Sequence, residues 1–79
     1  MEGITNIKKT QEDIDRCKAI VRDEINVDLT EDMVIALTKD IMDTAIFIGG
    51  DFSDENMREI AKQYQNTGAV DRFIRKYDR

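Results

Sequence analysis

Apolar side chains recur at intervals of three and four residues along almost the whole chain, and this spacing constrains the fold more than any other feature. It places the side chains on one face of an α-helix. No stretch alternates long enough to indicate a strand, and there is no Pro to interrupt a helix. Because 79 residues suffice for one domain only, we predict an all-α fold. It is a single helical domain over residues 1–79, a small compact bundle of three main helices and a short C-terminal one.

The first predicted helix covers residues 11–25 and begins after Thr10, a residue type that caps helix N-termini. An earlier start capped by Thr5 stays open, because Ile7 lies in phase with the apolar stripe. Asn26 is predicted to end the helix in the left-handed conformation. The stripe consists of Ile14, Cys17, Val21 and Ile25.

The second predicted helix, over residues 31–48, is capped by Thr30 and stopped by Gly49. Its apolar surface is wider than one neighbouring helix can cover, so we expect this helix to lie at the centre of the bundle. One stripe holds Val34, Leu37, Ile41, Ala45 and Ile48, and a second stripe holds Ile35, Met42 and Ile46.

The remaining predicted helices form a hairpin. Ser53 caps the third, the segment 65–68 breaks the chain, and a short helix ending at Tyr77 follows. The two helices have similar apolar faces, consisting of Met57, Ile60, Ala61 and Tyr64 in the third and Val70, Phe73, Ile74 and Tyr77 in the fourth.

The second stripe of helix 31–48 has two interpretations. It is covered by the other helices, or it forms a surface for self-association or for a partner protein. Phe47 projects among the polar side chains of the same helix, so it extends such a surface. The predicted apolar partner-binding residues are Ile35, Met42, Ile46 and Phe47.

Charge favours a protein partner over nucleic acid or membrane. The chain has 12 basic and 17 acidic residues, a formal net charge of −5, and its acidic groups concentrate in residues 1–56. Asp23 and Glu24 lie at the end of a predicted helix, where acids are mildly unfavourable, so folding supplies no reason for them. We therefore predict that Asp23, Glu24 and Asp28 contact a partner with a basic surface.

Composition argues against catalysis and metal binding. With no His and one Cys, the chain cannot form a Ser-His or Cys-His pair, a His-containing zinc site or an intramolecular disulfide. Asp51, Ser53 and Glu55 imitate the start of a calcium loop, but the later Gly and Glu of that motif are missing. Asp40 and Asp43 lie on a polar face, without the burial that tunes a catalytic carboxylate. We expect no enzymatic activity, no cofactor and no metal.

The C-terminal hairpin gives an alternative function. It faintly resembles a helix-turn-helix DNA reader with exposed cations on its second helix, although Gln65 and Asn66 occupy positions where that motif usually has a Gly and an apolar residue. Cations in a final turn also stabilise the helix dipole. The nucleic-acid-binding residues under this alternative are Arg72, Arg75, Lys76 and Arg79.

The prediction for function is therefore a small acidic interaction protein. We expect it to bind, and to inhibit or regulate, a larger protein, one class of which handles nucleic acid. Phage and mobile-element regulators, including inhibitors of bacterial defence systems, often have this size and composition, an analogy that carries no residue match. The alternatives are a dimeric helix-turn-helix regulator and a ligand-sensing or structural homo-oligomer. Because the sequence shows no signal peptide or membrane span, we expect a cytoplasmic location.

Overall fold

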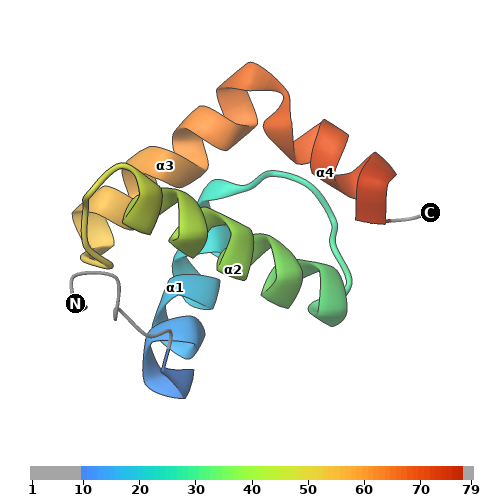
Figure 1. Ribbon diagram of the computed structural model, residues 1–79. Helices are drawn as coiled ribbons and strands as arrows, with labels where there is room; N and C mark the ends of the chain where they lie inside the picture. The colour runs from blue at the N-terminus through green and yellow to red at the C-terminus, as the bar shows by residue number, and fades with distance from the viewer. Residues whose placement is uncertain (1–9, 78–79) are drawn as a thin grey trace.

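The computed structural model describes residues 10–77, which form four α-helices and no strand. In chain order they are α1 (Gln11–Glu24), α2 (Glu31–Phe47), α3 (Asp54–Thr67) and α4 (Ala69–Tyr77) (Figure 1). The prediction of an all-α fold with three main helices and a short C-terminal one is confirmed. None of the four helices combines the length and the apolar character that a membrane span requires.

Each of the first three helices begins at the predicted hydroxyl cap. The side-chain oxygens of Thr10, Thr30 and Ser53 accept the backbone N–H three residues later, at 3.1, 3.3 and 3.3 Å. Acidic side chains occupy the first turn of all three helices, where they interact favourably with the positive end of the helix dipole. The alternative start at Thr5 lies outside the described residues.

The helix ends follow the sequence less closely. Gly49 and Gly68 adopt φ values of +80° and +79°, so both act as left-handed stops. The predicted left-handed stop at Asn26 is wrong, because α1 ends with Ile25 in an extended conformation and the Asn26 N–H donates to the Gln65 side chain at 3.3 Å. The expected break over 65–68 shrinks to Gly68 alone, since α3 stays helical through Thr67.

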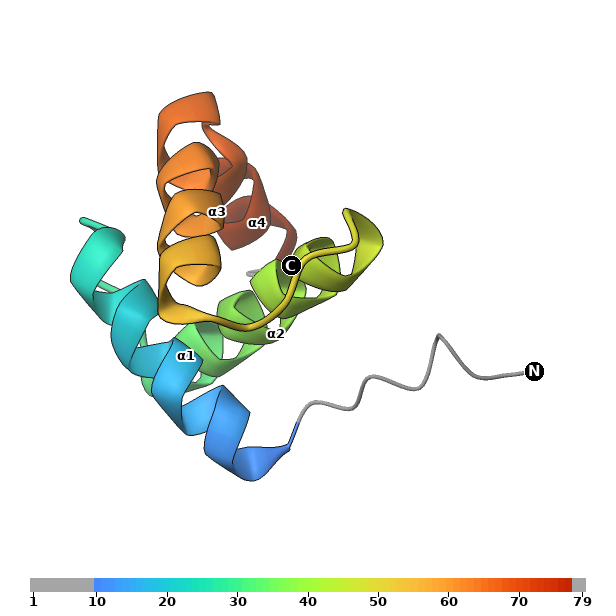
Figure 2. The ribbon, with the colours of Figure 1, turned by 90° about the vertical axis from the view of Figure 1, so that its left-hand side faces the viewer.

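Two helices share the centre of the molecule. Both α2 and α3 pack against all three other helices, whereas α1 and α4 do not pack against each other. In Figure 2, α1 lies at the lower left and α4 lies behind α3. The expectation that helix 31–48 lies at the centre of the bundle is confirmed, and α3 shares that position. The core draws on every helix and includes Cys17, Val21, Leu37, Ile41, Met42, Met57, Ala61 and Val70.

Ion pairs on the surface tie the first three helices together. The Glu31 carboxylate, at the start of α2, accepts from Lys18 at 2.6 Å and from Arg22, both on α1. Arg16 of α1 donates to Asp54 of α3 at 2.7 Å. The pKa of Glu31 is lowered, first by the hydrogen bond from Lys18 and then by that from Arg22. These exposed contacts link the N-termini of α2 and α3 to α1.

Candidate partner-binding surface

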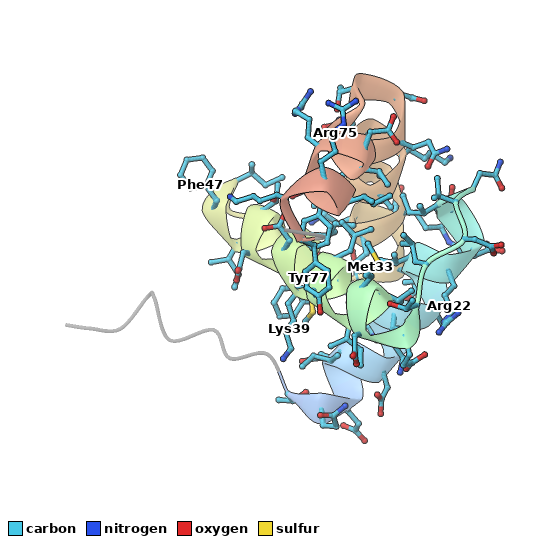
Figure 3. All side chains as sticks on the ribbon, turned by 90° about the vertical axis from the view of Figure 1, so that its right-hand side faces the viewer. Arg22, Met33, Lys39, Phe47, Arg75 and Tyr77 are labelled. Atoms are coloured by element: carbon cyan, nitrogen blue, oxygen red, sulfur yellow. The ribbon has the colours of Figure 1, made fainter. Side chains whose placement is uncertain are left out.

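The C-terminal end of α2 carries the most exposed apolar side chains in the described part of the chain. Phe47 is 89% exposed and Ile48 is 59% exposed. Gly50 N–H donates to Ala45 O at 2.8 Å and Gly49 N–H to Ile46 O at 3.0 Å, which closes the helix in a Schellman motif. This turn leaves Phe47 projecting from one end of the helix (Figure 3). We call Phe47 and Ile48 the apolar tip.

The structure changes the predicted apolar set. Met42 is fully buried among the helices, so the expectation that it lies on a partner surface is wrong. Ile35 and Ile46 are half-buried. Ile48, expected on the buried stripe, is instead exposed, although its N–H still donates to Thr44 O at 3.0 Å as in a continuing helix. Of the four predicted apolar residues, Phe47 alone is largely exposed.

The acidic residues at the end of α1 have an internal partner. Arg58 of α3 donates to the Asp23 and Glu24 carboxylates, both at 2.8 Å, and its pKa is raised by these hydrogen bonds. The Glu24 side chain is only 18% exposed. The prediction that folding supplies no reason for Asp23 and Glu24 is therefore wrong. Asp28 lies exposed in the loop between α1 and α2 and stays a candidate for partner contact.

A groove of about 670 Å³ lies between α2, α3 and α4. Its floor holds a polar network in which the Tyr64 hydroxyl donates to Asp40 Oδ2 at 2.8 Å and lies 2.7 Å from the Thr44 hydroxyl. Burial raises the pKa of Tyr64, and the hydrogen bond to Asp40 adds to this. The groove is lined by Asp40, Tyr64, Ala69, Arg72, Phe73, Lys76 and Tyr77.

The wall formed by α4 combines rings with cations. The Phe73 and Tyr77 rings stack with centroids 5.9 Å apart. Arg72 and Lys76 line the same groove, and Arg75 is exposed at the upper side of α4 in Figure 3. Sequence reasoning placed these cations on α4 but did not pair Asp40 with Tyr64. The pattern of apolar and polar residues along a helix indicates which side of that helix is buried. It does not indicate which side chains of two different helices, such as Asp40 and Tyr64, contact each other.

The geometry bears on the DNA-reading alternative. A helix-turn-helix has a turn of three or four residues, whereas Gly68 alone separates α3 from α4. The Arg72 side chain also donates to Thr67 O at 3.4 Å, so it helps to cap α3. Arg75 and Lys76 are exposed, and Arg79 lies outside the described residues. The hairpin thus departs from the motif in its turn as well as in its residues.

The Asp51 carboxylate and the Cys17 thiol both have places within the fold. Asp51 accepts the Ser53 N–H at 3.2 Å, and its backbone oxygen accepts from the Asn56 side chain at 2.8 Å. The pKa of Asp51 is lowered by its hydrogen bond with Ser53. Within residues 10–77, no group of three or more Cys, Asp or Glu side chains is placed to hold a metal ion. Cys17 is buried, and burial raises the pKa of its thiol.

No protein-family model, curated protein or solved structure matches this chain.

Proposed function

We propose that this chain is a small non-enzymatic interaction protein that binds and regulates a larger protein through the apolar tip. The observation that supports this function is the 89% exposure of Phe47, beside Ile48 at 59%. Burying one such side chain in a partner pocket is worth roughly 1.5–3 kcal/mol. A few deeply inserted aromatic side chains supply most of the energy in many interfaces. Phe47 suits this role because its side chain is almost fully exposed and so contributes little to the stability of the fold.

Charge near the apolar tip supports a partner pocket with a basic border. Asp43 lies one helical turn before Phe47, and Asp40 lies two turns before it on the same face of α2. The whole chain has a formal net charge of −5. An apolar pocket bordered by Lys or Arg side chains would complement this arrangement and would attract it over long range. Proteins that handle nucleic acid expose such cations, so they form one fitting class of partner.

The experiment compares Phe47→Ala with the control Val27→Ala, which truncates another exposed apolar side chain, one that is 39% exposed in the α1–α2 loop. Partners captured from the host by the wild type are identified, purified and titrated against each variant. Phe47→Ala should weaken binding by about 10- to 100-fold, the range of an interface anchor. Val27→Ala should stay within about twofold of the wild type.

Two further measurements complete this test. Thermal melts should be the same for both variants, because neither side chain is buried. The association rate should fall as salt rises, because screening weakens the attraction between acidic and basic surfaces. A purified partner that binds Phe47→Ala as tightly as the wild type would contradict the proposed role of the apolar tip.

A further inference from the structure

The connection between α3 and α4 is a single residue. Gly68 has φ +79° and ψ 9°, the helix before it ends at Thr67, and the helix after it begins at Ala69. The Arg72 N–H already donates to Gly68 O at 3.1 Å, with the four-residue spacing of an α-helix. A change of backbone conformation at this one residue would therefore join α3 and α4.

The contacts that hold α4 in place are few. Val70 is its one buried residue, and Phe73 and Ile74 pack against the core while partly exposed. Tyr77 is 47% exposed. The break also deprives Thr67 O of the amide partner that a continuous helix would supply, and the Arg72 guanidinium replaces that partner at 3.4 Å.

We propose that two copies of this chain exchange α4. Gly68 becomes helical, α3 and α4 form one helix over residues 54–77, and the α4 segment of each copy packs on α2 and α3 of the other copy. The receiving surface fits this segment, because it is the surface that α4 covers within one chain. Each groove is then composite, with Asp40 and Tyr64 from one copy and Arg72, Phe73, Lys76 and Tyr77 from the other.

A second copy of this chain is the partner that fits the surfaces exposed when α3 and α4 form one helix. A straight helix over 54–77 would carry Val70, Phe73 and Ile74 away from the core of its own chain. It would also uncover the surfaces of α2 and α3 on which these side chains pack. In a pair of copies, the apolar face of each α4 segment packs on the uncovered surfaces of α2 and α3 of the other copy. Both kinds of surface are then buried, and the pair closes with two-fold symmetry. The exchange is independent of the apolar tip, which lies on α2 and does not move.

The test is the variant Gly68→Ala. A Cβ at Gly68 would meet only Arg72 Nη1, at 3.9 Å, so space does not oppose the substitution. Ala disfavours the positive φ of the bent form and favours the helix of the exchanged form. The two effects together should raise the dimer association constant by about a thousandfold, or about thirtyfold for each chain. Sedimentation equilibrium from micromolar to millimolar protein measures the constant.

Gly49→Ala is the matched control. Gly49 has φ +80° with open space around it, so the variant has a similar backbone cost. The next helix begins only at Asp54, so α2 has no adjacent helix to join. We expect Gly49→Ala to keep the wild-type association constant. A dimer formed equally by both variants would overturn the proposal.

Chemical shifts distinguish exchange from ordinary association. In the Gly68→Ala dimer, the Cα shifts of residues 66–70 should be continuously helical. A monomer at millimolar concentration, or a dimer in which residue 68 is not helical, would overturn the proposal.

A second pair of variants applies if Gly68→Ala does not fold. Arg72→Gln removes the guanidinium that caps Thr67 O in the bent form, while Arg75→Gln removes an exposed cation from the same helix. Arg72→Gln should dimerise several-fold more strongly than Arg75→Gln, because only the former weakens the bend. Equal association constants for the two variants would overturn the exchange.

Discussion

The three-helix body, formed by α1, α2 and α3, differs from α4 in how it is held. Fully buried side chains join the body, and ion pairs link α1 to both α2 and α3. By contrast, α4 has one buried side chain and a partly exposed ring pair. Yet the sequence of α4 separates apolar from polar positions as cleanly as that of any other helix. A helix buries its apolar face only as far as it has neighbours to cover it.

This comparison implies an uneven distribution of stability. Opening α4 removes one buried side chain, Val70, from the core, whereas α1 and α3 each contribute several buried side chains to it. Local opening free energies follow such differences in buried contact. The exchange requires that α4 opens more easily than the three-helix body. The apolar tip belongs to that body, so it keeps its position during the exchange.

Large-to-small substitutions should give the largest difference between the two regions. Leu37→Ala removes a fully buried side chain of the body and should cost about 2–5 kcal/mol of unfolding free energy. Ile74→Ala truncates a partly exposed side chain of α4 and should cost about 1–2 kcal/mol. Urea unfolding measures both. Equal costs would place α4 within the body.

The helix caps should give an intermediate effect. Thr30→Ala and Ser53→Ala each remove the oxygen that accepts a backbone N–H at a helix start within the body. Each should lower the unfolding free energy by about 0.5–2 kcal/mol. Thr67→Ala is a useful control, because the Thr67 hydroxyl bonds within its own helix, to Gln63 O. A cap variant as stable as this control would mean that the cap is not formed in solution.

Charge reversal at the end of α1 should give a smaller loss. In Asp23→Lys with Glu24→Lys, two cations face Arg58 in place of the carboxylates that accept its hydrogen bonds. The thermal midpoint should fall, more than it falls for the single change Asp28→Lys in the nearby loop. A double variant more stable than the wild type would show that the Arg58 contacts contribute nothing and that helix-dipole repulsion dominates.

The pH dependence should give the smallest effect. The pKa of Glu31 is lowered by Lys18 and Arg22, so the unfolded chain binds more protons than the folded chain at acidic pH. The stability from these contacts is complete above the unfolded pKa, about 4.3. It is lost as pH falls through the lower folded value. Glu31→Gln should therefore flatten part of the acid limb of a stability-versus-pH curve, and an unchanged limb would contradict these contacts.

The helix starts were readable from the sequence because each depends on local chemistry. Thr10, Thr30 and Ser53 act on amides three residues away, so no distant part of the chain is needed to predict them. The stop of α2 at Gly49 was readable for the same reason, since Gly adopts the left-handed conformation without strain. The end of α3 was predicted too early, because α3 stays helical through Thr67. Asn26 was misread because its N–H bonds a side chain 39 residues away.

The candidate site was only partly predictable. Phe47 was identified because its position on the polar face of α2 follows from helical geometry alone. Met42 was misassigned because its burial depends on how many helices surround α2. The contacts of Arg58 with Asp23 and Glu24 join residues 35 and 34 positions apart, so no local pattern could reveal them.

Native-state hydrogen exchange of the monomer tests most directly whether α4 is held separately from the three-helix body. Amides in the middle of α2 and α3, such as those of Ile41 and Ile60, should exchange only through global unfolding. The amides of Phe73, Ile74 and Arg75 should exchange through a local opening of lower free energy that depends little on denaturant. If the α4 amides instead follow the global unfolding reaction, α4 is an integral part of the body and the comparison fails.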